Sequence, residues 1–109
     1  MYERDEVVYV LCLDARRRAV CCREIGRGVV NAAAVNARRI AELALEQRAG
    51  SVILSHNHLS GNALPSAEDE NATRQIARAL ALLGVELLDH IVVAGCDYVS
   101  MAECGTLSR

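Results

Sequence analysis

Two short, almost continuous apolar runs constrain the fold more than any other feature of this 109-residue chain. They read SVILSH at residues 51–56 and ELLDHIVVA at residues 86–94. Runs of this length and composition are typical of strands inside a sheet that is covered on both faces. A long segment from about Ser66 to Gly84, with apolar residues at helical spacing, separates them. Apolar strands that alternate with helices favour an α/β domain.

The other segments complete the predicted order β-β-α-β-α-β-β. Residues 7–14 and 19–30 are rich in strand-favouring side chains, and the charged stretch between them predicts a hairpin turn. A helix is expected over residues 37–48, with Asn36 as its N-cap, and a short last strand at residues 98–101. Hairpins at both ends of the chain argue against a purely parallel sheet, so we expect a mixed sheet in a single domain.

The composition is that of a globular protein and excludes several function classes. Hydrophobic residues make up 52% of the chain and charged residues 24%. Aromatic residues make up only 3% and the net charge is −2, which argues against a base-stacking surface or strong nucleic-acid binding by this chain alone. No apolar stretch is long enough to span a membrane, and the charged N-terminal MYERDEVVY is unlike a signal peptide, so we expect a cytoplasmic protein.

The cysteines point to a reducing environment. Their number, five, is odd and no CxxC spacing occurs. We therefore expect reduced, mostly buried thiols rather than a disulfide framework.

The stretch SHNHLSGNALPSAED, residues 55–69, carries the strongest chemical signal. Side chains two apart in a strand point to the same side, so His56 and His58 at the end of SVILSH can direct both imidazoles to one point. A loop with Gly and Pro can fold the chain back, so that Asp69 in the first turn of the next helix supplies a third ligand. Two imidazoles and one carboxylate suit Zn²⁺, and three protein ligands leave one position open, as in catalytic zinc sites.

The same stretch also has a purely structural interpretation. Ser66-x-x-Asp69 at a helix start is close to a capping box, with Ser66 as the N-cap and Asp69 at the third helical position. A histidine in a loop is usually only solvated. The two interpretations are compatible, because an aspartate in the first helical turn can face a crevice while Ser66 caps the helix.

A zinc site that activates water also needs a general base, and Glu24 is the candidate. Side chains alternate along a strand, so Glu24 shares a face with Val20 and Cys22. A carboxylate beside such residues is costly unless it has a partner or a function. The alternative is a strand-end glutamate in solvent, beside Arg23 or Arg27.

These residues together resemble the JAMM (JAB/MPN+) metalloproteases, whose pattern is Glu…His-x-His-x7-Ser-x-x-Asp. The surrounding sequence is similar to the bacterial RadC branch over about residues 5–107. The similar segments are REIGRGVVN, SVILSHNHLSG, LLGVELLDHIVV and YVSMAE. The chain departs from that family at Leu59, where members usually have Pro, which loosens the constraint on the loop. The matching residues here are Glu24, His56, His58, Ser66 and Asp69.

The resemblance implies a cytidine-deaminase-like, three-layer α/β/α fold with a mixed central sheet, in one JAB/MPN domain over residues 1–109. It also implies one Zn²⁺ per chain on His56, His58 and Asp69. The expected activity is that of a zinc metallopeptidase acting on peptide or isopeptide bonds of a protein or peptide substrate. Longer RadC members carry an N-terminal helix-hairpin-helix segment that binds DNA, and we do not expect one in this chain.

The resemblance also assigns two catalytic roles. Glu24 would be the general acid/base, and Ser66 would help to stabilise the oxyanion. Asn57 and Ser60 are expected to line the substrate loop. His90, within LLDHIVV, is interpreted as a core or sheet histidine bonded to the backbone rather than as a ligand.

Three other functions compete with the peptidase hypothesis. A zinc nucleobase deaminase has a related fold but needs HxE and CxxC, whereas His58 stands in place of the glutamate. An HNH nuclease is suggested by the letters alone, but its motif residues are scattered over a ββα unit. The serious alternative is a non-catalytic JAB/MPN binding module in a DNA-repair-associated or protein-interaction role. The intact set of five residues favours catalysis, because degenerate members would lose some of them.

Overall fold

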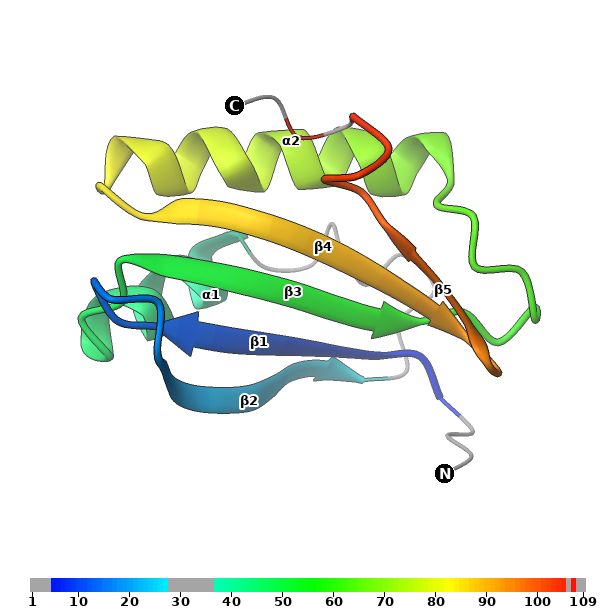
Figure 1. Ribbon diagram of the computed structural model, residues 1–109, viewed down its shortest axis with the longest axis horizontal. Helices are drawn as coiled ribbons and strands as arrows, with labels where there is room; N and C mark the ends of the chain where they lie inside the picture. Colours follow the sequence, from blue (N-terminus) through cyan, green and yellow to red (C-terminus); the bar gives the residue numbers. More distant parts are fainter. Residues whose placement is uncertain (1–4, 28–36, 106, 108–109) are drawn as a thin grey trace.

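The computed structural model describes residues 5–27, 37–105 and 107. Within these residues the strands and helices follow the predicted order (Figure 1). The elements are β1 (Val7–Leu13), β2 (Ala19–Arg27), α1 (Ala37–Glu46), β3 (Ser51–Asn57), α2 (Ala67–Leu82), β4 (Glu86–Ala94) and β5 (Asp97–Ser100). The predicted N-cap Asn36 and the last three residues of the predicted second strand lie outside the described residues.

The strands form one sheet in the order β2-β1-β3-β4-β5. β3 and β4 are parallel, and the other neighbouring pairs are antiparallel. The two apolar runs are thus the inner parallel pair, β3 and β4, as expected for strands joined by a helical crossover. The α/β class with a mixed central sheet is confirmed.

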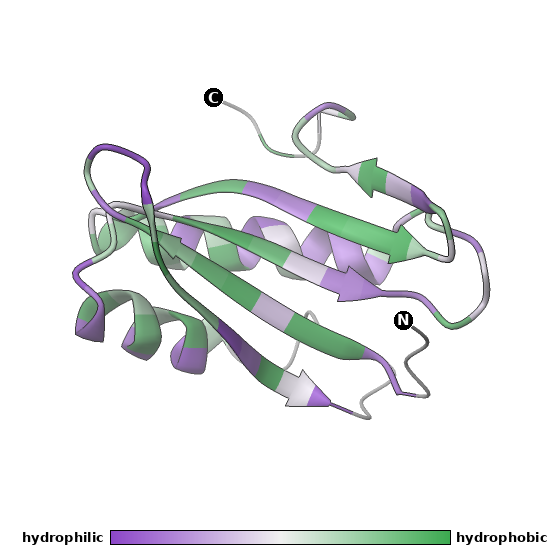
Figure 2. Cartoon of the chain, turned by 60° about the horizontal axis from the view of Figure 1, so that its bottom comes forward, coloured by the Kyte–Doolittle hydropathy of each residue, from purple (hydrophilic) through white to green (hydrophobic). Residues whose placement is uncertain are grey.

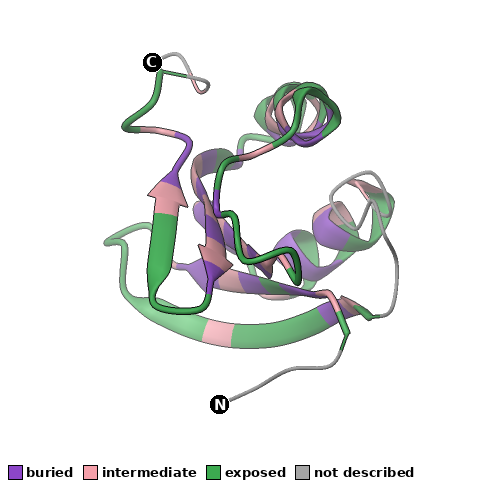
Figure 3. Cartoon of the chain, turned by 90° about the vertical axis from the view of Figure 1, so that its right-hand side faces the viewer, coloured by how far each residue is buried: buried purple, intermediate pink, exposed green. Residues whose placement is uncertain are grey.

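Both described helices pack on the same face of this sheet. α1 connects β2 with β3 and α2 connects β3 with β4, so both crossovers advance in the same direction across the sheet. Crossovers between parallel strands are right-handed, and two that share hand and direction place their helices on one face. Figure 3 shows both helices within the concave side of the curved sheet. The described residues therefore form two layers, where three were expected.

The hydrophobic core lies between the concave face of the sheet and the two helices. Figure 2 shows hydrophobic residues along β1, β3 and β4 and hydrophilic residues at the carboxyl end of β3. Removing these aliphatic side chains from water is the main force that holds the helices to the sheet. The buried cluster comprises Val8, Val10, Cys12, Ile25, Ile40, Leu43, Ala44, Ala49, Val52, Leu54, Ile76, Leu80, Val85 and Leu87.

The turn between β1 and β2 satisfies its own polar groups. The Asp14 carboxylate accepts hydrogen bonds from the backbone N–H groups of Arg16 and Arg18, at 2.8 and 3.0 Å. The Arg18 side chain pairs with the same carboxylate, and Arg17 pairs with Glu86 on β4. The arginine triplet therefore belongs to a structured surface turn, as expected.

The thiols differ from the sequence prediction in their burial. All five cysteines are free, but only Cys12 is buried, while Cys22, Cys96 and Cys104 are exposed. The physical reason is that Cys22 lies on the uncovered face of β2, and the other two lie in turns beside β5. Neither α1 nor α2 is long and apolar enough to cross a membrane.

Candidate metal centre

The two histidines of the His-x-His motif lie where β3 leaves the sheet. His56 is the penultimate residue of β3 and is 2% exposed, with its ring on the concave face. His58 follows the strand, and its backbone N–H donates to the carbonyl of Val93 at 2.7 Å. This bond extends the ladder with β4 by one residue. It holds His58 in the extended conformation that keeps both rings on the same side.

Asp69 reaches the histidines from the first turn of α2. The capping box is present: the Ser66 side chain accepts from the Asp69 backbone N–H at 3.0 Å, and the Ser66 backbone N–H donates to Asp69 Oδ2 at 2.9 Å. The structural interpretation of this stretch is therefore confirmed. The same carboxylate is 5% exposed and points inward, toward the end of β3. One side chain thus caps the helix and lies beside both histidines.

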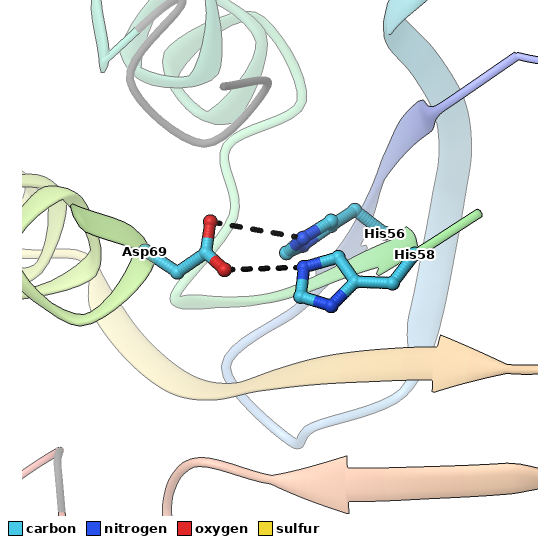
Figure 4. Close-up of side chains that lie close together, drawn as sticks. All are labelled: His56, His58 and Asp69. Carbon is cyan, nitrogen blue, oxygen red and sulfur yellow. Dashed lines mark hydrogen bonds and ion pairs between the residues drawn. The ribbon is translucent and has the colours of Figure 1, made fainter. Parts of the chain in front are cut away.

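The three side chains converge in the arrangement that Figure 4 shows. His58 Nε2 lies 3.1 Å from Asp69 Oδ2, and His56 Nε2 lies 3.9 Å from Asp69 Oδ1. One candidate ligand atom from each residue lies within 4.8 Å of the others. Ligand atoms around a tetrahedral zinc with bonds near 2.0–2.1 Å are about 3.3 Å apart. The cluster could therefore hold a metal ion after only small side-chain shifts.

The hydrogen-bond chemistry of His58 fits a cation at this point. Its Nδ1 lies 3.0 Å from the backbone carbonyl of Asn62. A carbonyl oxygen can only accept, so Nδ1 carries the hydrogen, and in the neutral ring Nε2 carries a lone pair. That lone pair faces a carboxylate oxygen of Asp69, and two such atoms approach closely only with a proton or a cation between them. The donor set of two imidazoles and one carboxylate matches Zn²⁺.

Burial keeps the first histidine in its neutral form. Desolvation lowers the pKa of His56 to about 4, although the Asp69 carboxylate acts in the opposite direction. Burial also tends to raise the pKa of Asp69. The hydrogen bonds from Ser66 and the nearby histidines outweigh it, so the pKa of Asp69 is lowered. At neutral pH the site thus holds a neutral imidazole and an ionised carboxylate, the protonation states that metal binding requires.

Glu24 is not brought to this cluster. A bulge in β2 leaves Ile25 without a partner on β1, so that Glu24 pairs with Tyr9, which in turn pairs with Ser55. Neighbours across strands share a face, which places Glu24 on the face opposite His56.

The Glu24 side chain is 39% exposed and bonded to a neighbouring cation. Its carboxylate accepts two hydrogen bonds from the Arg27 guanidinium, at 2.6 and 3.3 Å. These bonds hold the pKa of Glu24 below its usual range. The carboxylate is thus ionised at neutral pH, as a general base has to be, but it is directed toward Arg27.

The two expected loop residues have different surroundings. The Asn57 side chain accepts from the Val7 backbone N–H at 2.6 Å and donates to the Asp5 carbonyl at 3.0 Å. It therefore joins the ends of β1 and β3 across the sheet. Ser60 is exposed, and its hydroxyl accepts from the Asn62 backbone N–H at 3.4 Å, within the loop that positions His58.

Two further buried side chains, which were not among the site residues predicted from the sequence, connect the cluster with β4 and α2. His90 on β4 is 0% exposed, and its Nε2 lies 2.7 Å from His56 Nδ1. Its Nδ1 lies 2.7 Å from the hydroxyl of Thr73 on α2, which is also 0% exposed. The ring of His90 is thus bonded to side chains, not to the backbone as predicted. The available signal was a histidine within an apolar strand next to the strand of the His-x-His motif.

This chain is similar in sequence to a known protein family and to several bacterial proteins. A family model described as the RadC-like JAB domain matches residues 1–106. A UPF0758 protein of Cupriavidus pinatubonensis is 49% identical over 103 residues, which cover 94% of this chain and 45% of that protein. A UPF0758 protein of Bordetella pertussis is 44% identical over 106 residues, covering 97% and 47%. One of Stenotrophomonas maltophilia is 47% identical over 103 residues, covering 94% and 44%. This chain spans less than half the length of these relatives.

Proposed function

The chain belongs to the RadC-like JAB domain family, and on that premise we propose that it is a zinc-dependent metallohydrolase that cleaves peptide or isopeptide bonds. The observation that carries the proposal is the convergence of His56, His58 and Asp69 at the carboxyl end of β3. In sheets with parallel strands, ligands bind in crevices outside the carboxyl ends of the strands. Three protein ligands also leave room for a substrate or water, as in catalytic zinc sites.

In this proposal His56, His58 and Asp69 hold one Zn²⁺ per chain. When bound, the ion supplies Lewis-acid chemistry, which lowers the pKa of a water and polarises a carbonyl group. Asp69 is ionised and nine-tenths or more buried. Little water screens its charge, so it would attract a bound cation strongly. The hydrogen bonds from Ser66 hold this carboxylate in place before any substrate arrives.

The remaining catalytic roles fall to Glu24 and Ser66. Glu24 takes a proton from the attacking water onto its carboxylate and returns it to the leaving amine nitrogen. Its carboxylate is bonded to Arg27 on the opposite face of the sheet, so this ion pair has to open and the end of β2 has to rearrange before Glu24 can act. Ser66 is exposed at the start of α2, and it donates its hydroxyl hydrogen to the developing oxyanion. Asn57 and Ser60 are at most indirect contributors, through the strand end and the loop. The substrate is a protein or peptide, in the cytoplasm.

The position of Glu24 favours one alternative. It lies on the face of the sheet opposite the three ligands, and a carboxylate held there cannot act as a base. A metal-binding JAB/MPN module without hydrolase activity, in a DNA-repair-associated or protein-interaction role, would need the three ligands but not Glu24.

Metal content and turnover together test the proposal. Protein purified without added metal should contain near one zinc per chain, and His58→Ala should abolish this content. Glu24→Gln should keep the zinc and lose cleavage of a peptide library. Glu86→Gln is the matched control, because Glu86 is also an exposed strand glutamate paired with an arginine.

The outcomes separate the two functions. Zinc at one per chain, with no cleavage by the wild-type protein, would support the binding module. Zinc binding no tighter than millimolar would contradict both. Cleavage that survives Glu24→Gln would refute the role of Glu24 as the base.

A further inference from the structure

A chain of buried hydrogen bonds runs from α2 through β4 to the ligand His56. The Thr73 hydroxyl lies 2.7 Å from the Asp69 carbonyl and 2.7 Å from His90 Nδ1. His90 Nε2 then lies 2.7 Å from His56 Nδ1. The three side chains in this chain are 2% exposed or less, so water does not offer them alternative partners.

The number of hydrogens on each group determines which group donates and which accepts in each of these hydrogen bonds. The carbonyl oxygen of Asp69 has no hydrogen, so the Thr73 hydroxyl must donate to it, and a hydroxyl has only one hydrogen to donate. Toward His90 the Thr73 oxygen can therefore only accept, which places the His90 hydrogen on Nδ1. A neutral imidazole has one N–H group and one lone pair, so with its hydrogen on Nδ1 the His90 ring has its lone pair on Nε2.

The same reasoning assigns the hydrogen on the ring of His56. Because His90 Nε2 accepts, His56 must donate from Nδ1, and its own lone pair is then on Nε2. That atom is the one that faces Asp69 Oδ1, at 3.9 Å. The opposite tautomer of His56 would place an N–H group toward the cluster and could not bind a cation there.

We infer that Thr73 and His90 are positioning residues that hold His56 in the tautomer able to bind a metal. Helix α2 thereby contributes to the cluster in two ways. The Asp69 side chain supplies one ligand, and the Asp69 carbonyl orients a second ligand, His56, through Thr73 and His90. Metal-bound histidines in general have their second nitrogen bonded to an oriented partner. Here that partner is a second histidine, oriented by the helix that carries the carboxylate ligand. The inference rests on the metal site of the proposed function, but not on peptidase activity.

The tautomer can be measured without metal or substrate. In metal-free protein labelled with ¹⁵N, long-range proton–nitrogen correlation spectra at pH 7 should show hydrogen on Nδ1 and a lone pair on Nε2 for His56. Thr73→Val removes the acceptor for His90 with little change in shape. It should mix or invert the His56 tautomers and weaken zinc binding, measured by competition titration, by about 10- to 100-fold. Thr73→Ser keeps the hydroxyl and should restore both readouts.

A pair of substitutions at position 90 provides the second test. His90→Gln can present an amide oxygen near the position of Nε2, so zinc affinity should stay closer to that of the wild type than in His90→Leu, which leaves the His56 N–H group without an acceptor. The inference is overturned if His56 in the wild-type, metal-free protein carries its hydrogen on Nε2. It is also overturned if folded Thr73→Val keeps the wild-type tautomer and zinc affinity. A protein that binds zinc at this site and cleaves no peptide would contradict the proposed function alone.

Discussion

Burial of the imidazole rings of His56 and His90 sets the protonation of the site. Desolvation lowers the pKa of His56 to about 4 and that of His90 to about 3, and the neighbouring His56 ring further lowers the pKa of His90. Both rings are therefore neutral at physiological pH, each with one nitrogen free to accept or to bind a metal. A neutral histidine pair of this kind makes the stability of the metal-free protein depend on pH.

We predict that metal-free protein loses stability as the pH falls from about 6.5 toward 4. A histidine whose folded pKa is below its unfolded value is protonated first in the unfolded chain. Its stabilising contribution is complete above about pH 6.5 and is lost as the pH falls toward the folded pKa. Between pH 6.5 and 5 each ring should cost on the order of 2 kcal/mol. Urea denaturation in the presence of a chelator measures this loss.

His90→Gln is the control for this prediction. It removes one of the two buried rings, so the loss of unfolding free energy between pH 6.5 and 5 should be roughly halved. An equal loss in the variant and the wild type would show that other groups are responsible.

The start of α2 combines a stabilising cap with a candidate metal ligand, Asp69. The reciprocal bonds between Ser66 and Asp69 satisfy two backbone N–H groups at the helix start, and Asp69 also places negative charge at the positive end of the helix dipole. At the other end, Gly84 adopts a positive φ of 76° and ends the helix just after its last turn. The helix therefore begins and ends where the sequence predicts, and its first turn presents Asp69 to β3.

We predict that Ser66→Ala weakens both the helix and the site. Loss of the N-cap hydroxyl should lower the unfolding free energy of the metal-free protein by about 1 kcal/mol. Zinc affinity should fall as well, because Asp69 loses a partner that restrains its backbone. Ser60→Ala is the matched control, since Ser60 is an exposed serine of the same loop with a long 3.4 Å hydrogen bond. Equal denaturation midpoints for the two variants would contradict a capping role for Ser66.

Across the whole molecule the site joins segments that are distant in sequence. His56 and His90 are 34 residues apart and lie on neighbouring parallel strands, while Asp69 and Thr73 come from the helix that connects those strands. A ligand that binds this arrangement only in the folded chain stabilises the whole fold by mass action.

We predict that zinc raises the thermal midpoint of the protein. At a concentration one hundred times the dissociation constant, binding at one site contributes about 2.7 kcal/mol. For a domain of this size that corresponds to a rise of roughly 10 °C, measured by circular dichroism with and without a chelator. His58→Ala should show no rise.

The exposed cysteines are a competing source of zinc binding in this experiment. A variant with Cys22, Cys96 and Cys104 replaced by serine should keep the full rise, since these thiols lie outside the cluster. A rise that disappears in this variant, or that persists in His58→Ala, would place the zinc elsewhere.

The sequence by itself determined the elements and the three candidate ligands. Strand and helix periods are local properties of the chain, and His56, His58 and Asp69 lie within one strand–loop–helix segment, so their spacing is sufficient to predict their convergence. Only the tertiary structure decided which helices share a face of the sheet, because that depends on the strand order that the crossovers span. It also decided that the bulge at Ile25 turns Glu24 toward Arg27, and that His90 lies against His56. These features depend on register and pairing between segments far apart in the chain, which no local pattern encodes.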